Sequence, residues 1–300
     1  MAAFNAAATI RESIQSVLDQ THSCVELIVV DDGSTDQTVQ IVEELVSLNA
    51  GAVRLLEQQH KGPYPARNLA IRASKGRYIA FLDADDTWRP DCLTLLHFAL
   101  EEHDADVAYC GWQNVGPAAP GSEPFIPPAY DDDEIVLAAL RSCPWPIHAA
   151  LSRRSAIEAV GGFSERMFTS MDYDLWIRLI AHTRRIVRVP EVMAFYHWRG
   201  GQISSDRSRQ VLDAVQVRRD FVKNNALLLK NVPEAKRIEL IDGQLAARAY
   251  EALWRRQLRT AQTLFRAYFS SMHWKLKDLP YVLCSLLPAG LFDWVVTRRD

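Results

Sequence analysis

The stretch YIAFLDADDTW, residues 78–88, places three carboxylates at the end of a short apolar run. Asp83, Asp85 and Asp86 are so close in the chain that they repel one another, and something must offset their charge. One interpretation is a solvated turn, in which Asp side chains bond to nearby backbone N–H groups. The other is a divalent cation such as Mg²⁺ or Mn²⁺, which is usually held by one or two carboxylates together with substrate phosphates. The stretch alone leaves both open.

The segments around this stretch alternate between helical and strand-like patterns. The expected order is helix, strand, helix, strand, helix, strand over residues 7–20, 25–31, 34–48, 52–58, 64–76 and 77–86. Such alternation predicts a parallel sheet with right-handed crossovers, in which ligands bind beyond the carboxyl ends of the strands. Asp31–Asp32 and Asp83–Asp86 both follow strands, so we expect them to meet at one edge. Ser34 or Thr35 is expected to cap the second helix.

The first predicted helix lacks a full strand before it, because only MAAF precedes it. Either the fold does without that strand, or Met1 is an internal methionine of a chain that starts upstream. We expect the second. The loss of this strand would remove part of the ligand site at that edge.

The second half of the chain divides at about residue 205. Helix, strand and a Pro/Gly-rich loop are expected over residues 90–106, 107–115 and 116–130. Beyond Ser205 the pattern is helical throughout. We therefore expect an α/β domain over residues 1–205 and a helical region over residues 206–300.

Composition limits the class of protein. The five cysteines show no CxxC or CxH spacing, which argues against a zinc site and a disulfide framework and fits a reducing compartment. The N-terminus has no apolar signal-peptide region, and no run approaches ~20 apolar residues. These features predict a cytoplasmic protein, with contact to the inner face of a membrane left open.

Two further motifs carry polar residues near predicted helix starts. In GPYPARNLAI, Arg67 and Asn68 lie where backbone N–H groups favour anions, and an Arg adds bidentate phosphate contacts. A surface Arg is the alternative. After the strand at 25–31, Asp32 precedes the helix cap, so a carboxylate there can accept a hydrogen bond from a donor edge such as the N3–H of uracil.

The motif SMDYDLWIRL, residues 170–179, places Asp172 and Asp174 two positions apart. In a helix they point about 200° from each other, so they cannot share one task. One of them is expected near the cleft, where a carboxylate can deprotonate a hydroxyl nucleophile. The alternative is a helix N-terminus with favourable acidic residues.

Together these motifs resemble a family 2 glycosyltransferase with a GT-A fold, over about residues 2–205, roughly two thirds of the chain. The carrying motifs are AAFNAAATIRESIQSVLDQTH, ELIVVDDGSTDQT, GPYPARNLAI, GRYIAFLDADDTWRPD, VGGF and MDYDLWIRL. The resemblance implies a Rossmann-like, mostly parallel nucleotide-binding sheet flanked by helices, followed by a helical extension. It implies an inverting, metal-dependent and non-processive transfer of one sugar from a nucleoside-diphosphate sugar to a hydroxyl acceptor, in surface polysaccharide or glycoconjugate synthesis.

The resemblance also implies roles for substrate-binding residues. Phe4 would stack or pack on the base and Asp32 would bind its polar edge. Arg67 would face the diphosphate and Asp83 would touch the ribose. By family habit the nucleotide is UDP, with GDP and dTDP open.

The same resemblance implies that Asp85, with Asp86, holds Mg²⁺ or Mn²⁺ and that Asp172 is the catalytic base. The sequence departs from the family in two places that bear on these roles. Met171 stands where an acidic residue is usual, and FYHWRGGQIS has His197 and Arg199 exchanged relative to the usual order. Either side chain can reach phosphate or metal. The absence of a QxxRW motif after Asp172 argues against a processive synthase.

The region after residue 206 differs in charge from the rest. It contains 17 Lys and Arg against 9 Asp and Glu, a net charge of +8, whereas the first 206 residues carry −11. Basic residues mixed with aromatics can bind an anionic membrane surface, where a lipid-linked acceptor would reside. Amphipathic helices with a solvated basic face are the equal alternative. Nucleic acid is not expected as a partner, because no recognition module accompanies the charge.

Two other functions stay open from the sequence. One is a nucleotidyltransferase on a similar sheet, which usually shows a Gly-rich basic loop after its first strand; AAFNAAATIRE has none. The other is a non-catalytic nucleotide-sugar-binding relative that keeps the fold.

Overall fold

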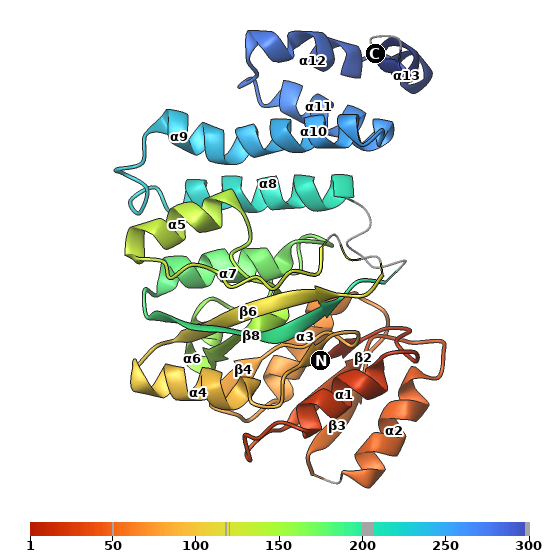
Figure 1. The fold of residues 1–300 in the computed structure, drawn as a ribbon, viewed down its shortest axis with the longest axis vertical. Coiled ribbons are helices and arrows are strands. Elements are labelled where there is room, and N and C mark those ends of the chain that lie inside the picture. Colours follow the sequence, from red (N-terminus) through yellow and green to blue (C-terminus); the bar gives the residue numbers. More distant parts are fainter. Residues whose placement is uncertain (50, 118, 120, 200–206, 298–300) are drawn as a thin grey trace. The chain divides into compact units, whose positions relative to one another are not determined.

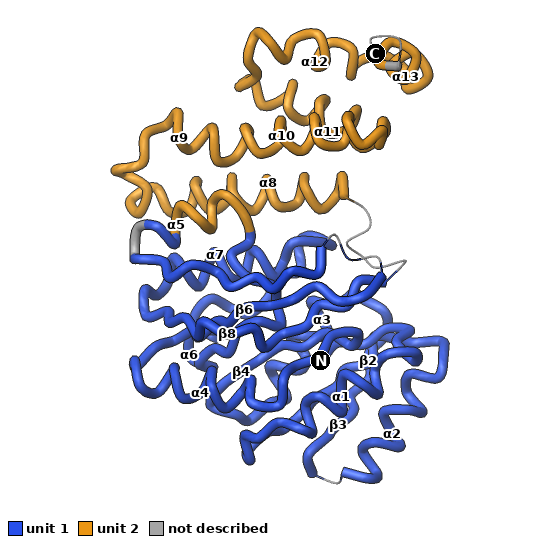
Figure 2. Tube along the Cα trace, viewed as in Figure 1, with its two compact units in different colours: residues 1–135, 143–202 blue, residues 136–142, 203–300 orange. Residues whose placement is uncertain are grey.

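The structure is a computed structural model that describes residues 1–49, 51–117, 119, 121–199 and 207–297. Its chain divides into two compact units (Figure 2). Unit 1 comprises Met1–Ile135 and Cys143–Gln202, and unit 2 comprises Val136–Ser142 and Ile203–Asp300. The segment Val136–Ser142 thus belongs to unit 2. A single boundary near residue 205, as expected from the sequence, assigns this segment to the first domain.

Unit 1 alternates helices and strands as the sequence predicts, and Figure 1 labels most of them. Its elements are β1 Ala2–Ala3, α1 Ile10–Leu18, β2 Leu27–Asp31, α2 Thr38–Leu48, β3 Val53–Glu57, α3 Pro63–Ala73, β4 Tyr78–Ala80, β5 Thr87–Trp88, α4 Cys92–Glu102, β6 Val107–Val115, the 3-10 turn Ile147–Ala149, β7 Ala150–Arg153, α6 Arg154–Ala159, α7 Met171–His182 and β8 Ile186–His197. Helix α5, Asp132–Arg141, begins in unit 1 and continues into unit 2.

A three-stranded parallel sheet in the order β1-β2-β3 forms the first half of unit 1. All five residues of β2 are buried, which explains their unbroken apolar run. Helix α3 covers one face of this sheet by packing Ala66 on Ile28 and Val30. The short strand β1 pairs with β2 through Ala2 and Ala3. A strand therefore does precede α1, although it is only two residues long.

The second half of unit 1 is a mixed sheet in the order β4-β7-β6-β8-β5. Only the pair β6 and β8 is parallel; the other three pairs are antiparallel. The sequence instead predicts that β4 continues the parallel sheet. In the structure β4 pairs with β7, and a cavity of about 190 Å³ is lined by residues of both β2 and β4. Strand β4 thus takes its hydrogen-bond partners from β7, which lies far along the chain, and a local sequence pattern does not indicate such a partner.

The structure contradicts the expected cap of the second helix and confirms the irregular segment after β6. Helix α2 begins at Thr38, and the carboxylate of Asp36 accepts the Thr38 N–H at 3.0 Å, so the expected cap at Ser34 or Thr35 is wrong. The Oγ of Ser34 accepts the N–H of Asn5 instead, at 2.9 Å. Within the described part of residues 116–130 the chain is irregular, as predicted, apart from a bridge between Phe125 and Trp112.

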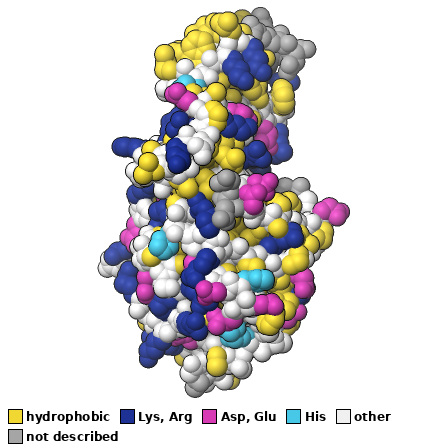
Figure 3. Space-filling view, turned by 90° about the vertical axis from the view of Figure 1, so that its left-hand side faces the viewer, with side chains coloured by type: hydrophobic (Ala, Val, Ile, Leu, Met, Phe, Trp, Pro, Cys, Tyr) yellow, Lys and Arg dark blue, Asp and Glu magenta, His cyan; other side chains and the backbone are white. Residues whose placement is uncertain are grey.

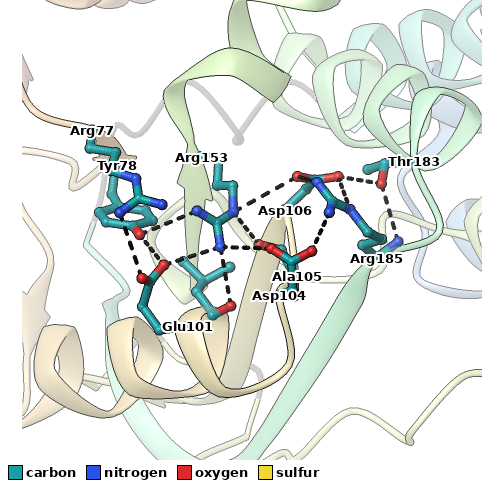
Figure 4. A network of polar contacts seen from close by, with 10 residues as sticks. Arg77, Tyr78, Glu101, Asp104, Ala105, Asp106, Arg153, Thr183 and Arg185 are labelled. Atoms are coloured by element: carbon teal, nitrogen blue, oxygen red, sulfur yellow. Dashed lines mark hydrogen bonds and ion pairs between the residues drawn. The ribbon is translucent and has the colours of Figure 1, made fainter.

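A polar network fastens the mixed sheet to α4 and to the loop before β8 (Figure 4). Asp106, at the start of β6, accepts hydrogen bonds from Thr183 at 2.6 Å and from Arg185 at 2.6 and 3.1 Å. On the other side, Arg153 of β7 donates to the carbonyl of Ala105 at 2.7 Å and lies 3.1 Å from Glu101. The network ties segments that are far apart in the chain.

Unit 2 is helical, as the sequence predicts. Its elements are α8 Arg207–Asn224, α9 Glu234–Ile238, the π-helical turn Glu239–Gly243, α10 Gln244–Trp254, α11 Leu258–Ser270, the 3-10 turn Leu276–Asp278, α12 Leu279–Ser285 and α13 Ala289–Thr297. These helices bury a core of their own, with Leu245, Phe265 and Phe292 completely inaccessible. Among the described residues, no helix has both the length and the apolar character needed to cross a bilayer.

The network around Asp106 yields a test of what holds unit 1 together. Asp106 is 8% exposed, so replacing it with Asn removes charge-assisted bonds from Thr183 and Arg185 in a buried place. We expect Asp106→Asn to lower the free energy of unfolding by about 2 kcal/mol, measured by urea denaturation. The matched control is Asp104→Asn, whose carboxylate is 79% exposed and also pairs with Arg185. An equal loss in both variants would contradict a stabilising role for the buried carboxylate.

Candidate active site

The turn after β2 carries two neighbouring carboxylates with different partners. Asp31 is buried, and its Oδ2 accepts the backbone N–H groups of Gly33 and Ser34 at 3.0 and 2.9 Å. This turn requires the positive φ of +78° at Gly33, which a residue with a side chain adopts only under strain. Asp31 therefore shapes the turn.

Asp32 faces the segment that leads into α3. Its Oδ1 accepts hydrogen bonds from the side chain of Gln58 at 2.7 Å and the N–H of Lys61 at 2.8 Å. Its Oδ2 accepts the N–H of Gly62 at 2.8 Å and lies 2.9 Å from Nδ1 of His60. A carboxylate can accept about four hydrogen bonds, so these four contacts occupy all the acceptor positions of Asp32. Asp32 orders this segment, and a direct bond to a base, as predicted, requires one of these donors to leave.

Phe4 lies beside the segment that Asp32 orders. Its ring is 45% exposed and stacks on the imidazole of His60, with centroids 4.1 Å apart and an angle of 28°. The next residue, Asn5, accepts the N–H of Thr35 at 2.8 Å and so ties Phe4 to the turn after β2. The ring of Phe4 is thus partly exposed, and its predicted stacking on a base stays a prediction. The structure adds His60, which the sequence analysis does not single out.

Arg67 occupies a buried place inside α3. It lies in the second turn and not at the helix start, because α3 begins at Pro63. The guanidinium is held over the rings of Tyr64 and Phe163, 5.3 and 5.5 Å from their centroids, and donates to Asp83. Burial opposes the charge of Arg67, but Asp83 outweighs burial and raises its pKa. Arg67 is therefore a permanent positive charge.

Asp83 is the partner of this charge at the start of the acidic cluster. Burial alone would raise the pKa of Asp83, but the charge and the hydrogen bond of Arg67 outweigh burial and lower it. One of the repelling carboxylates from the opening stretch is thus neutralised by a protein side chain. No cation is required for Asp83.

Asn68 binds the backbone of a neighbouring loop. It is buried, and its side chain bonds both the N–H and the carbonyl of Phe163, each at 2.9 Å. A Cβ at Gly162 would come within 2.8 Å of the Asn68 oxygen, so a glycine is needed there. Asn68 therefore positions the ring of Phe163 against Arg67.

Asp86 is completely buried, unlike the half-buried Asp85. Its Oδ1 accepts the backbone N–H of His197 at 2.8 Å, and its Oδ2 lies 3.1 Å from Nδ1 of His148. Both oxygens thus have a neighbour within the protein, and the predicted metal-ligand role of Asp86 stays a prediction. Asp86 joins the acidic stretch to the end of β8.

His148 is a residue that the sequence analysis missed. It is completely buried, and its ring stacks on Tyr196 with centroids 5.6 Å apart. Burial disfavours its charged form, but the carboxylate of Asp86 outweighs burial and raises the pKa of His148. A single histidine outside any motif gives no signal in the sequence, because only the fold brings it to Asp86.

Asp172 lies in the first turn of α7. The preceding residue, Met171, donates its backbone N–H to the hydroxyl of Tyr64 at 3.3 Å, which fixes the start of α7 beside α3. Burial raises the pKa of Asp172 above its ordinary value, despite the opposing N–H of Tyr173 and the charge of Arg67. A carboxylate with a raised pKa suits a general base.

Asp174 has a different environment from Asp172, as the spacing of two predicts. It is buried and paired with Arg166 at 2.8 Å and with Arg178 at 2.7 Å. Arg178 also donates to the carbonyls of Val160 and Gly162. Asp174 therefore holds the loop before α7, and Asp172 is the residue near Arg67 and Asp83.

His197 is the last residue of β8, Arg199 follows two positions later, and the two face different neighbours. The backbone of His197 binds Asp86, whereas the guanidinium of Arg199 lies 4.0 Å from the carboxylate of Glu12 in α1. The structure brings His197 to the acidic stretch. The residues that follow, 200–206, lie outside the described residues.

The acidic stretch fits a metal that is shared with a substrate. Within the residues that the structure describes, no three His, Cys, Asp or Glu side chains are arranged to hold a metal by themselves. Hard cations need only one or two carboxylates when a diphosphate supplies the other oxygens. Asp85 is half-buried, as is Asp83, and Thr9 fixes the loop by donating to the carbonyl of Ala84 at 2.7 Å.

Comparisons with known proteins give one consistent family. The model of glycosyl transferase family 2 matches residues 1–156, just over half of the chain. The chain is 42% identical over 108 residues to an uncharacterized glycosyltransferase, YibD, of Escherichia coli; the match covers 36% of this chain and 31% of YibD. The chain thus spans less than a third of that relative.

Two other relatives match over more of their length. A putative teichuronic acid biosynthesis glycosyltransferase, TuaG, of Bacillus subtilis is 27% identical over 68% of this chain and 79% of its own. The Escherichia coli UDP-Glc:alpha-D-GlcNAc-diphosphoundecaprenol beta-1,3-glucosyltransferase WfaP is 26% identical over 71% of this chain and 81% of its own.

Two solved structures share the fold. TarS of S. aureus, residues 1–349 in complex with UDP-GlcNAc, superposes with a TM-score of 0.65 at 20% identity over 95% of this chain and 78% of TarS. The mannosyltransferase PcManGT of Pyrobaculum calidifontis, in complex with GDP-Man and Mn²⁺, gives 0.62 at 18% identity over 98% and 84%. These likenesses confirm the GT-A fold, and the family match confirms the resemblance carried by the motifs: the chain belongs to glycosyl transferase family 2.

Proposed function

We propose that this protein transfers one sugar from a nucleoside-diphosphate sugar to a hydroxyl group of an acceptor, with inversion at the sugar. The observation that carries the proposal is the group formed by the buried Arg67 and the half-buried Asp83 and Asp172. These residues come from three separate segments: Arg67 donates to Asp83, and the charges of both act on the pKa of Asp172. Such a transfer needs a positive charge to balance the leaving diphosphate and a base to take the acceptor proton. Arg67 supplies the charge, and Asp172, with its raised pKa, supplies the base.

Each side chain then has a stated task. Asp172 takes the proton of the acceptor hydroxyl, whose oxygen forms a bond to the sugar carbon as the bond from that carbon to the diphosphate breaks. The leaving diphosphate departs with the electron pair, and Arg67 balances its charge. Since attack and departure occur on opposite faces of the sugar, the configuration inverts.

The nucleotide is proposed to lie along the strand ends. Phe4, stacked on His60, offers a flat surface for the base, and Asp32 keeps that surface in place through its bonds to the same segment. Asp83 is proposed to meet the ribose, and His197 and Arg199 to meet phosphate. Asp85 would hold Mg²⁺ or Mn²⁺, which supplies positive charge to the diphosphate when bound.

UDP is the proposed nucleotide and a lipid-linked saccharide the proposed acceptor. The TarS complex contains UDP-GlcNAc, and WfaP is named for UDP-glucose and for an acceptor on diphosphoundecaprenol. These relatives support a function in surface polysaccharide or glycoconjugate synthesis, which we propose takes place at the cytoplasmic face of the membrane. The GDP-Man complex of PcManGT keeps GDP open as the alternative.

Calorimetric titration of the protein with UDP, GDP and dTDP, with and without Mn²⁺, tests the donor site. We expect one nucleotide to bind in a metal-dependent way, and Asp85→Ala to weaken that binding by about tenfold or more, which is about 1.4 kcal/mol. Asp104→Asn, on the exposed side of the Asp106 network, is the control and should bind like the parent protein. Unchanged affinity in Asp85→Ala would refute the metal role of Asp85.

Replacing Asp172 with Asn tests the catalytic base. Asn keeps the shape but cannot take a proton, so we expect transfer to fall by about 10²–10⁴-fold while nucleotide affinity stays the same. Sugar transfer to a lipid-linked or soluble acceptor, followed by radiolabel, reports the rate, and calorimetry reports binding. A variant that keeps its rate shows that another group is the base. Binding without transfer by the unmodified protein would identify a non-catalytic relative.

The pH profile of transfer gives an independent test of Asp172. Its carboxyl is active only when deprotonated, and burial raises its pKa above the ordinary value for Asp. We therefore expect the rate to fall as the pH decreases through this raised pKa, in a range where an ordinary Asp is still ionised. The rate at saturating substrate should be followed alongside the melting temperature. A profile that falls only together with the loss of folded protein would contradict the assignment.

A further inference from the structure

Exposed apolar side chains gather on the last helices of unit 2. Among the described residues, 15 large hydrophobic side chains are exposed, and seven of them lie between residues 254 and 294. They are Trp254, Met272, Leu276, Leu283, Leu286, Leu291 and Trp294. Single exposed hydrophobic residues are ordinary, but a concentration of this kind marks an interaction surface.

The helix periodicity places these side chains on outward faces. In α12, Val282 and Ser285 are buried, whereas Leu283 and Leu286, each one position further on, are 50% exposed. Helix α13 repeats this pattern, because Phe292 is buried while Leu291 and Trp294 are 52% exposed. Each helix is therefore apolar on its inner and on its outer side. We call the outer side, formed by Leu276, Leu283, Leu286, Leu291 and Trp294, the α12–α13 face.

The turn between α10 and α11 lies against the same two helices. A pocket of about 280 Å³ joins them, with Trp254 and Arg256 on one side and residues of α12 and α13 on the other. The ring of Trp254 is 79% exposed at this pocket. The pocket thus places an exposed aromatic ring and a basic residue beside α12 and α13.

Basic residues accompany this face. Residues 252–297 contain six Lys and Arg but only two Asp and Glu. All six basic side chains are exposed: Arg255, Arg256, Arg259, Arg266, Lys275 and Lys277. Both acidic residues are engaged: Asp278 is buried and bonded to Tyr250 and Tyr268, and Asp293 lies 3.2 Å from Arg259. Figure 3 shows hydrophobic side chains with Lys and Arg among them over this part of unit 2.

We propose that the α12–α13 face docks on the surface of an anionic membrane. Leucine and tryptophan side chains enter the boundary between headgroups and acyl chains, while lysine and arginine at the edge meet anionic lipid headgroups. Helices α12 and α13 have 7 and 9 residues, about 10 and 14 Å at 1.5 Å per residue. The hydrocarbon layer is about 30 Å thick, so these helices lie on the membrane and do not cross it.

Charge argues against the two other occupants. A second copy bound face to face would bring the same basic residues against each other, and like charges in contact are unfavourable. A nucleic acid would meet the basic residues but would leave the leucines without a partner, since bases stack on aromatic rings and not on aliphatic chains. An anionic lipid surface satisfies both parts of the face.

The proposal rests on unit 2 alone and does not depend on the proposed sugar transfer. The test uses co-sedimentation of the full chain with lipid vesicles. One vesicle contains equal parts of phosphatidylcholine and phosphatidylglycerol, and the other contains phosphatidylcholine alone. We expect binding to the anionic vesicle, and weaker binding when salt rises from about 0.1 to 1 M, because the screening length falls from about 10 to 3 Å.

Two variants separate the apolar and the basic parts. Leu283→Glu with Trp294→Glu places charges on the outer side of both helices and should reduce the affinity for anionic vesicles about tenfold or more. Lys275→Gln with Lys277→Gln should have a similar effect at low salt and little effect at high salt. Leu48→Glu is the matched control, because Leu48 is an exposed leucine of unit 1, and its binding should be unchanged. Circular dichroism and melting temperature verify that each variant folds.

Three outcomes overturn the proposal. One is an unmodified protein that does not sediment with anionic vesicles. Another is a Leu283→Glu, Trp294→Glu variant that is folded and binds like the unmodified protein. The third is a dimer in light scattering that this variant converts to a monomer, with no vesicle binding by either, since the face is then covered by a second copy.

Discussion

The contact between the buried Arg67 and the half-buried Asp83 is the interaction on which the candidate site depends. The guanidinium is removed from water, and an unpaired charge in that place would be strongly unfavourable. Asp83 and the two rings of Tyr64 and Phe163 make the position tolerable. Because Phe163 is in turn held by Asn68, the pair connects α3, the acidic stretch and the loop before α7. Asp172 acquires its environment from the same group.

Two other buried carboxylates, Asp32 and Asp86, bind backbone groups of loops. Asp32 accepts two backbone N–H groups of the segment before α3, and Asp86 accepts the N–H of His197. Backbone donors of loops have no partner in a helix or sheet, so a carboxylate that binds them fixes the loop and satisfies buried polar groups. The repulsion within the acidic stretch is therefore offset mainly by the protein: Arg67 serves Asp83, and His148 with the N–H of His197 serves Asp86. Asp85 is the carboxylate proposed for the metal.

Unit 2 has a core of its own and an outer side that its core does not use. The helices bury Leu245, Phe265 and Phe292, while α12 and α13 show a second set of apolar side chains outward. A short helix that is apolar on two sides has more hydrophobic surface than packing within the unit can cover. The sequence shows the excess of Lys and Arg after residue 206. Only the structure shows that exposed apolar side chains accompany these basic residues, and the two together indicate a membrane-binding surface.

The sequence alone determined the order of elements and the position of the acidic stretch. Strand β6, Val107–Val115, agrees residue for residue with the prediction, because its apolar run is bounded by polar turns on both sides. Local pattern also placed Asp32, Asp83 and Asp172 after strands or at a helix start. Tertiary structure alone decided the pairing of β4 with β7 and the hydrogen-bond partners of Asp32 and Asp86. It also placed His148 beside Asp86. The physical reason is that the hydrogen-bond partner of a carboxylate is chosen among segments far apart in the chain, such as Asp86 and His197, 111 residues apart, and no local pattern carries that choice.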